Sequence, residues 1–364
     1  YVMKIVLQMF SFLPGKGELM NINHKVKIDI VAVAKAAGVS ISTVSRSFNH
    51  PDLVKAPTRK KIERAVQKLG YIRNRAAQVM HGRRSGTIGL IVPTIDHAIF
   101  AEVTQAFSDA MDEAGFTILI ASHGFDLEKE YLRLRKLLEH RVDGIALIGL
   151  DHSESTYQLL EQQRIPTVAI WNFDSTSKIS CIGADNFEAG RMAARHLLSL
   201  GHRDIGLIFP DTTENDRARN RLMGARSELS GAGIHVPEGW QIVSPYRSSM
   251  AKDACKSMLR KPARPTALLC GNDIIAQGAV YGAMQLHLSV PQDVSIMGIG
   301  DFKGSSEMEP GLSTIRIPAK KIGRLAGKRI VKEVTGESTQ LSRQRCELKL
   351  MTRSTTRARL TIST

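Results

Sequence analysis

The stretch SISTVSRSFN carries side chains that suit the groove of a nucleic-acid duplex. An arginine such as Arg46 can donate two hydrogen bonds to the O6 and N7 atoms of guanine. The Ser42 hydroxyl can bond several bases, and the Ile41 side chain can contact a thymine methyl group. Thr43 and Ser45 are better placed to reach phosphates. This stretch is therefore a candidate for contacts with duplex DNA.

Two short helices joined by a tight turn are the elements that would position these side chains. Apolar residues recur with helical spacing over Ile30–Ala37, and Gly38 ends that predicted helix. Ser40 caps a second predicted helix, in which Val44 and Phe48 face inward. The pattern is typical of a helix-turn-helix, although short Ala-rich helix pairs in other globular domains share it.

The distribution of charge favours a nucleic-acid partner. The 364-residue chain has a net charge of +15, and residues 21–86 hold 14 Lys and Arg against 3 Asp and Glu. Residues 316–364 hold 13 against 3, which leaves residues 87–315 acidic. A local basic block indicates a polyanion, most often nucleic acid, with an acidic membrane surface as the lesser alternative. A third helix is predicted over residues 58–69, within the basic stretch 21–86. The basic stretch 316–364 is typical of a solvated helix surface.

Composition and missing motifs exclude several protein classes. The length predicts more than one domain, and 43% hydrophobic with 23% charged residues is typical of a globular protein rather than a membrane protein. Neither nucleotide-binding, hydrolase nor metalloprotease motifs occur, so we expect no enzyme activity, no catalytic residue, no cofactor and no metal. Residues 1–27 are expected to be an unstructured extension. The cysteines stand apart, as in proteins of a reducing, cytoplasmic compartment, and are Cys181, Cys255, Cys270 and Cys346.

The acidic part of the chain alternates between two patterns. Short apolar runs such as TIGLIV, DGIALIG, DIGLIF and VSIMGIG are each followed by an amphipathic helical pattern. Unbroken apolar runs between helices indicate parallel strands that are buried on both faces. The sequence therefore predicts a doubly wound α/β core behind an all-α, helix-turn-helix headpiece. Ligands of such sheets bind beyond the carboxyl ends of the strands.

The words AGVSISTVSRSFN, TRKKIERAVQKLGYIRN, NRAAQVM and SGTIGLIVP resemble the LacI/GalR family of bacterial transcription regulators. The resemblance implies a headpiece over residues 28–73 with its motif at 30–49, then a hinge helix and linker over 74–86. In that family the hinge helix inserts an apolar side chain into the minor groove, a place that Met80 occupies. The resemblance also includes Ser40, Asn49 and Asn74 among the DNA contacts.

The same resemblance implies a core over residues 87–360 made of two lobes, like a periplasmic sugar-binding protein. We expect the first lobe at about 87–170 and 302–317, and the second at about 171–301 and 318–360. An effector would bind in the cleft between the lobes. The positions that match the family's effector contacts are Phe100, Trp171, Arg219, Asn272 and Asp301.

Two observations bear on the effector. Arg219 lies in an arginine-rich run that is typical of a solvated helix face, and only the family register favours it as a contact. Many relatives read GYDD where this chain reads GIGD, which places Gly300 where a carboxylate usually accepts hydrogen bonds from a sugar. Losing that carboxylate favours an anion, and GIGDF resembles the gluconate repressor branch. The hypothesis is a sugar-acid effector.

The sequence therefore predicts a cytoplasmic, sequence-specific DNA-binding regulator that represses genes of carbohydrate or sugar-acid catabolism. Its expected partners are double-stranded operator DNA, a small-molecule sugar or sugar-acid effector, and a second copy in a homodimer, with no membrane partner. Two alternatives are an activator and an exported sugar-binding protein for transport or chemotaxis. The exported protein would have no use for residues 28–86.

Overall fold

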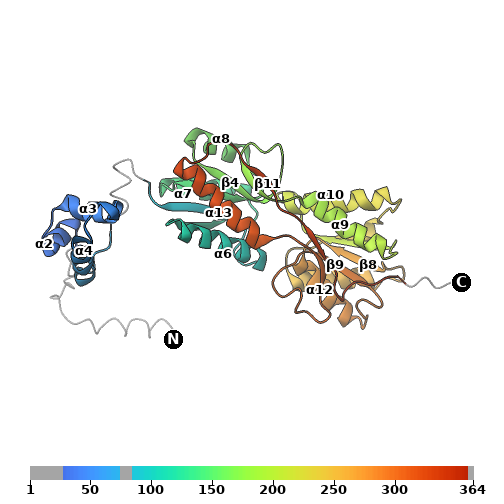
Figure 1. The fold of residues 1–364 in the computed structure, drawn as a ribbon. Coiled ribbons are helices and arrows are strands. Elements are labelled where there is room, and N and C mark those ends of the chain that lie inside the picture. The colour runs from blue at the N-terminus through green and yellow to red at the C-terminus, as the bar shows by residue number, and fades with distance from the viewer. Residues whose placement is uncertain (1–27, 74–83, 360–364) are drawn as a thin grey trace, which may run out of the picture. The chain divides into compact units, whose positions relative to one another are not determined.

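The computed structural model describes residues 28–73 and 84–359. Two compact units make up the chain, Tyr1–His81 and Gly82–Thr364, and Figure 1 shows their helices and strands. The extension expected over residues 1–27 lies outside the described residues. So do Asn74, Met80 and most of the expected hinge helix and linker.

The headpiece is a set of short helices around a small apolar core. It consists of α2 (Ile30–Ala37), α3 (Ile41–Asn49), the 3-10 turn η1 (Pro51–Leu53) and α4 (Ala56–Leu69). Gly38 ends α2 in the left-handed conformation, at φ 65°, which a residue without Cβ adopts at little cost. Val33, Val44 and Ile62, one from each α-helix, are fully or almost fully buried. The helices α2 and α3 form the helix-turn-helix fold that the sequence predicts, and α4 begins two residues earlier than expected.

The core contains two six-stranded sheets, each with its own covering helices. The first has the strand order β11-β5-β4-β3-β1-β2 and the second β12-β10-β9-β8-β6-β7. All neighbours pair in parallel except β10 and β12. The first sheet consists of β1 (Thr87–Val92), β2 (Thr117–Ser122), β3 (Gly144–Ile148), β4 (Thr167–Asn172), β5 (Ser180–Ala184) and β11 (Arg343–Arg345). The second consists of β6 (Ile205–Phe209), β7 (Gln241–Val243), β8 (Ala267–Cys270), β9 (Ser295–Gly300), β10 (Ser313–Arg316) and β12 (Lys349–Met351).

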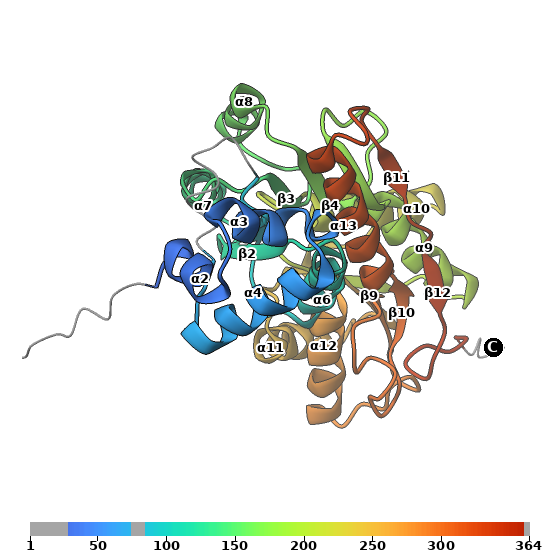
Figure 2. The same cartoon turned by 60° about the vertical axis from the view of Figure 1, so that its left-hand side comes forward.

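Helices cover both faces of each sheet, as the unbroken apolar strands require. On the first sheet, α6 (Ala98–Glu113) and α13 (Ala319–Thr335) pack together over one face, and α7 (Leu127–Glu139) and α8 (Glu154–Gln163) lie on the other. On the second sheet, α9 (Asn186–Ser199) pairs with α10 (Asp216–Gly231), and α11 (Ser248–Leu259) with α12 (Asp273–Gln285). The turn η2 (Glu238–Trp240) precedes β7. Figure 2 shows the covering helices from a second direction.

The lobes have other boundaries than those expected. The first sheet keeps β5, which pairs with β4 after a loop that contains no helix. The segment expected to cross back into the first lobe instead forms β10, which pairs with β9 in the second sheet. It is α13 that returns to the first lobe, where it packs against β4 and α6. The chain therefore crosses between lobes after β5, after β10 and after β11.

Candidate functional site: a recognition helix and an interlobe cleft

Helix α3 presents the candidate DNA contacts on its exposed side. The Ser40 side chain caps the helix by accepting a hydrogen bond from the Thr43 amide at 3.2 Å. Ile41, Ser42 and Arg46 are exposed, and within the described headpiece the Arg46 side chain forms no ion pair or hydrogen bond. A buried Val44 fixes the opposite side of the helix in the core. The helix thus holds an unpaired guanidinium, a hydroxyl and an apolar side chain where a groove could receive them.

Asn49 is occupied within the headpiece. Its amide donates to the Ser45 carbonyl oxygen at 2.8 Å, and its side-chain oxygen accepts a hydrogen bond from Arg73. The Arg73 guanidinium also lies 5.5 Å from the centre of the Phe48 ring, in cation–π contact. Asn49 therefore joins the end of α3 to the last described residue of the headpiece, and its contact with DNA stays a prediction.

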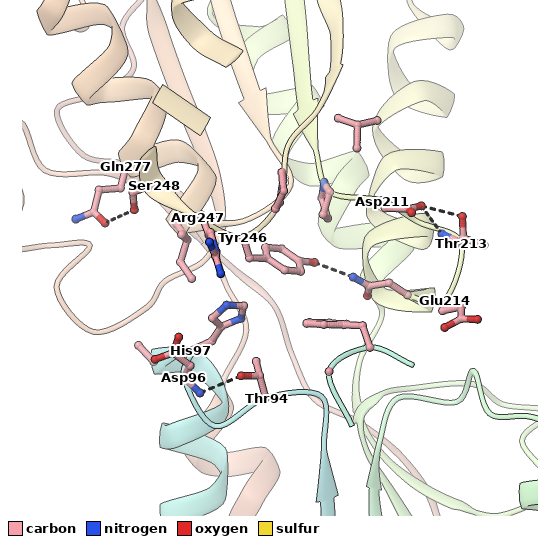
Figure 3. A pocket seen from close by; sticks show the side chains of 18 residues that line it. Thr94, Asp96, His97, Asp211, Thr213, Glu214, Tyr246, Arg247, Ser248 and Gln277 are labelled. Carbon is pink, nitrogen blue, oxygen red and sulfur yellow. Dashed lines mark hydrogen bonds between the residues drawn. The ribbon is translucent and has the colours of Figure 1, made fainter. Parts of the chain in front are cut away.

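The carboxyl ends of strands from both sheets face a cleft between the lobes. Its outer chamber has a volume of about 900 Å³, and Figure 3 shows the side chains that surround it. Thr94, Asp96, His97 and Phe125 come from the first lobe. The second lobe contributes loops after β6 and β7 and the first turns of α11 and α12, with residues that include Asp211, Asn215, Tyr246, Arg247 and Gln277.

Aromatic side chains close the inner end of this chamber. Tyr246 of the second lobe meets His97 edge to face, with ring centroids 5.5 Å apart, and lies 5.8 Å from the Phe125 ring. Burial lowers the pKa of His97, while the Asp96 carboxylate acts in the opposite direction. The three rings separate the outer chamber from a smaller, enclosed inner cavity.

The inner cavity brings together three of the residues that the sequence singled out. Phe100, Trp171 and Asn272 all line it, and the first two rings lie 6.3 Å apart. The other lining residues are His97, Phe125, Arg217, Arg221, Tyr246 and Phe302. Its volume is only about 20 Å³, room for about one water molecule. A larger ligand would have to widen this cavity by separating the rings.

Arg219 and Asp301 lie outside the inner cavity. Arg219 points to the rim of the cleft, where it pairs with Asp151 at 2.9 Å and donates to the Thr212 carbonyl oxygen. Asp301 is bound by Arg316 and Arg353 at 2.5 and 2.7 Å. The family resemblance implied an effector contact for Arg219, whereas the arginines of α10 that line the inner cavity are Arg217 and Arg221.

Arg217 and Arg221 are the arginines of α10 that reach the cavity. They stand one turn apart on the face that carries Gly224, where a Cβ would lie 1.9 Å from the Phe187 carbonyl oxygen of α9. A spacing of i, i+4 and i+7 places all three on one side of a helix. Helical periodicity from Gly224 was thus the signal that could have identified them.

Arg221 is a buried cation without a carboxylate partner among the described residues. Its Nε donates to Asn186 at 2.7 Å and one terminal nitrogen donates to the Gly271 carbonyl oxygen at 3.1 Å. Burial lowers its pKa to about 10, the Tyr246 hydroxyl acting in the opposite direction. Arg217, by contrast, is paired with Asp216 at 3.0 Å. The cavity therefore holds one guanidinium charge that an anionic ligand could neutralise.

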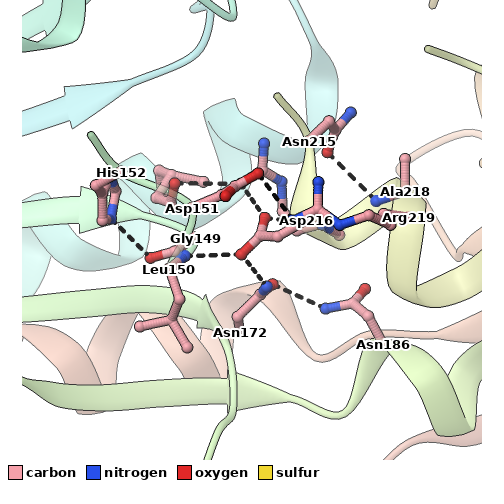
Figure 4. A network of polar contacts seen from close by, with 12 residues as sticks. Gly149, Leu150, Asp151, His152, Asn172, Asn186, Asn215, Asp216, Ala218 and Arg219 are labelled. Carbon is pink, nitrogen blue, oxygen red and sulfur yellow. Dashed lines mark hydrogen bonds and ion pairs between the residues drawn. The ribbon is translucent and has the colours of Figure 1, made fainter. Parts of the chain in front are cut away.

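A buried polar network joins the lobes next to this cavity (Figure 4). The Asp216 carboxylate, at the start of α10, accepts hydrogen bonds from the Leu150 amide at 2.7 Å and the Asn172 side chain at 2.5 Å. It also accepts from the backbone and side-chain nitrogens of Arg217. Leu150 and Asn172 belong to the first lobe, so Asp216 is an interlobe link.

Over residues 28–73 and 84–359, no helix has the length and apolar character to cross a bilayer. The same residues contain no group of histidine, cysteine and carboxylate side chains arranged to hold a metal ion.

Comparisons with known proteins agree with this arrangement. Residues 29–74 match the model of bacterial regulatory proteins of the lacI family, and residues 194–356 match a periplasmic binding protein-like domain. The HTH-type transcriptional repressor PurR of Shigella sonnei is 33% identical over 296 residues, 81% of this chain and 86% of that protein.

Solved structures are similar as well. The transcription regulator GntR from Chromobacterium violaceum has a TM-score of 0.70 and 29% identity, over 74% of this chain and 99% of that one. The lac repressor dimer bound to operator and the anti-inducer ONPF has a TM-score of 0.81 and 26% identity, over 91% and 99%. These relatives are transcriptional regulators and not enzymes.

Proposed function

The chain belongs to the lacI family of bacterial regulatory proteins, and on that premise we propose that it represses genes of sugar-acid catabolism in response to an anionic effector. Members of the family are DNA-binding repressors with an effector-binding domain. Beyond that family role, we propose a sugar-acid effector, genes of sugar-acid catabolism as targets, a homodimer and a cytoplasmic location. The observation that carries the effector class is the buried guanidinium of Arg221 in the interlobe cavity, which has no carboxylate partner among the described residues.

The electrostatics of the cavity support an acid. A buried arginine gains most from a charged acceptor, because charge-assisted hydrogen bonds are about twice as strong as neutral ones. Gly300, which stands where many relatives have a carboxylate, cannot be replaced by a larger residue without conflict, since a Cβ would lie 2.0 Å from the Phe302 ring. Phe302 thus occupies the space that a side chain at position 300 would need.

The remaining lining residues suit the body of a polyhydroxy acid. Trp171 and Phe100 offer ring faces to the apolar C–H groups of such a ligand, and Asn272 is a nearby polar side chain. Its oxygen caps α12 by accepting from the Ile275 amide at 3.0 Å, which leaves its amide hydrogens for a hydroxyl group. The cavity thereby offers both charged and neutral hydrogen-bond donors.

A homodimer would explain the apolar surface of the second lobe. Met250 of α11 and Tyr281 and Met284 of α12 are 48%, 45% and 55% exposed. Large exposed apolar side chains on neighbouring helices are typical of an interaction surface. Two headpieces related by a twofold axis would read a palindromic operator. An effector that separates the lobes would change the distance between the two headpieces.

Effector binding can be tested through Trp171 fluorescence. The chain has two tryptophans, so Trp240→Phe leaves Trp171 as the only reporter. We expect gluconate to change its emission and glucose to have no effect at the same concentration. In that background Arg221→Gln should weaken gluconate binding by about 10- to 100-fold, the value of a charge-assisted hydrogen bond.

Arg219→Gln is the matched control, because it removes an arginine of the same helix that lies at the rim. It should leave gluconate binding unchanged. Tight binding of glucose with none of gluconate, or an equal loss in both arginine variants, would contradict the proposal.

A further inference from the structure

A buried asparagine of the second lobe, Asn186, lies between the cavity arginine and the contact that joins the lobes. It is the first residue of α9 and is 3% exposed. Its side-chain oxygen accepts a hydrogen bond from Arg221 Nε at 2.7 Å, and its amide nitrogen donates to the Asn172 oxygen at 2.9 Å. Asn172 in turn donates to the Asp216 carboxylate, and Figure 4 shows the path from Asn186 through Asn172 to Asp216. Two amides therefore bridge a guanidinium and a carboxylate.

The two ends of this bridge fix the orientation of both amides. A guanidinium has only donors, so the Asn186 atom that faces Arg221 must be the oxygen. The NH₂ group of Asn186 then faces Asn172, which must present its own oxygen. The NH₂ group of Asn172 is left to face a carboxylate oxygen, which also accepts from the Leu150 amide. Neither amide can turn over without placing two donors or two acceptors against each other.

The backbone of Arg221 is held close to α9, the helix that carries Asn186. A Cβ at Gly190 would lie 1.9 Å from the Arg221 carbonyl oxygen, so only a glycine permits this approach. Because its backbone is fixed, Arg221 can move its charge only by turning its side chain. The bonds to Asn186 and to the Gly271 carbonyl oxygen oppose that turn. The remaining N–H groups of the guanidinium have no acceptor among the described residues.

An amide can orient an arginine without neutralising it. A carboxylate in the place of the Asn186 amide would also accept from Nε, but it would form a charge-assisted bond of about twice the strength. It would then compete with any anion for the same guanidinium. The carboxylate that does stand nearby, Asp216, is paired with Arg217 at 3.0 Å. The two amides thus keep that carboxylate away from Arg221.

We propose that Asn186 is a positioning residue that sets the specificity for an anion, because it aims the Arg221 guanidinium and leaves its charge for the ligand. Asn172 holds Asn186 in the orientation that this role requires. The inference rests on the function proposed above, in which Arg221 binds the effector. Asn186 acts through Arg221, since it does not itself line the inner cavity.

Two substitutions of Asn186 test the proposal in the full chain, with gluconate as the probe and Trp171 emission as the signal in the Trp240→Phe background. Asn186→Ala removes the acceptor of Nε and should weaken gluconate binding by about 3- to 10-fold, the value of one neutral hydrogen bond. Asn186→Asp keeps an acceptor of the same shape but neutralises the guanidinium. It should weaken binding by about 10- to 100-fold, as Arg221→Gln does. Loss of packing alone would give the opposite order, because aspartate fills the space of asparagine.

Asn215→Asp is the matched control. Asn215 is a buried asparagine that caps α10, and its amide donates to the Tyr246 hydroxyl at 3.0 Å rather than contacting Arg221. The variant adds the same charge outside the bridge and should weaken gluconate binding by less than about threefold, well short of a charge-assisted bond. Equal losses in the two aspartate variants, or weaker binding by Asn186→Ala than by Asn186→Asp, would overturn the proposal.

A second measurement needs no ligand. The ¹⁵N–¹H signal of Arg221 Nε, identified by its absence in Arg221→Gln, reports whether Asn186 holds the side chain. Asn172→Ala removes the partner of the Asn186 amide, so exchange of the Nε proton with water should become about 3- to 10-fold faster. Asn172→Asp should restore slow exchange, because a carboxylate still accepts from the Asn186 amide.

An Nε proton that exchanges at the native rate in Asn172→Ala would also overturn the proposal. This comparison decides the matter if Asn186→Asp does not fold. If gluconate fails to bind the unaltered chain, the proposed function is wrong, and the exchange rates still show whether the two asparagines position Arg221.

Discussion

The interlobe carboxylate of Asp216 offers the sharpest test of how the cleft is held together. In Asp216→Asn one of the two oxygens becomes an NH₂ group. In the unaltered protein each carboxylate oxygen of Asp216 accepts two hydrogen bonds. Oδ2 accepts from Leu150 and Asn172, and Oδ1 accepts from the two nitrogens of Arg217. Whichever way the amide turns, two donors then face a donor.

The expected loss follows from those two bonds. A hydrogen bond to a charged group contributes about 1.5 to 3 kcal/mol, so the variant should lose about 3 to 6 kcal/mol of unfolding free energy. Urea unfolding followed by tryptophan emission measures it. Asp151→Asn removes a partly exposed partner of Arg219 and should cost less than about 1 kcal/mol. Equal small losses in both variants would refute the view that Asp216 joins the lobes.

Two further predictions concern the headpiece and the helix that carries the cavity arginine. Arg46→Ala should relax operator specificity at one base pair and weaken binding there by about 1 to 3 kcal/mol; an equal loss on random DNA, in a gel-shift series, would make Arg46 a phosphate contact. Gly224→Ala should separate α10 from α9 and lower the unfolding free energy by about 1 to 3 kcal/mol. Because Arg221 stands on that face, gluconate binding should fall as well, and a stable variant with unchanged affinity would contradict this coupling.

Much of the fold could be predicted because its signals are local. Buried parallel strands are continuous apolar runs. The run TIGLIV matches β1, and the run DIGLIF contains the whole of β6 with Asp204 before it. The headpiece helices follow from spacing and from the Ser40 cap. The lobe boundaries could not be predicted in the same way, because β5 contains Ser180 and Gly183 within a short run and no helix separates it from β4.

A residue of the cavity could be predicted from the sequence only where it stands near the end of a strand or caps a helix. Trp171 is the last residue but one of β4 and Asn272 caps α12, so both could be placed at the carboxyl edge of a sheet. The closing rings are different, because Phe125 and Tyr246 come from loops of separate lobes and meet only when the chain has folded. Arg219 was predicted from the family resemblance alone. The helical period points instead to Arg221, which shares a face of α10 with Gly224.

The three crossings of the chain between lobes also set an order for synthesis on the ribosome. The first sheet acquires β1 to β5 early, yet its covering helix α13 and its edge strand β11 follow the strands β6 to β10 of the other lobe. At about 5 to 20 residues per second, the nascent first lobe waits on the order of ten seconds for that helix. During this interval the apolar surface of β3 and β4 that α13 contacts is without that helix, and transiently exposed apolar surface of this kind is prone to aggregation. A shortened chain that stops after β10 would never acquire α13, so this apolar surface of β3 and β4 would stay exposed.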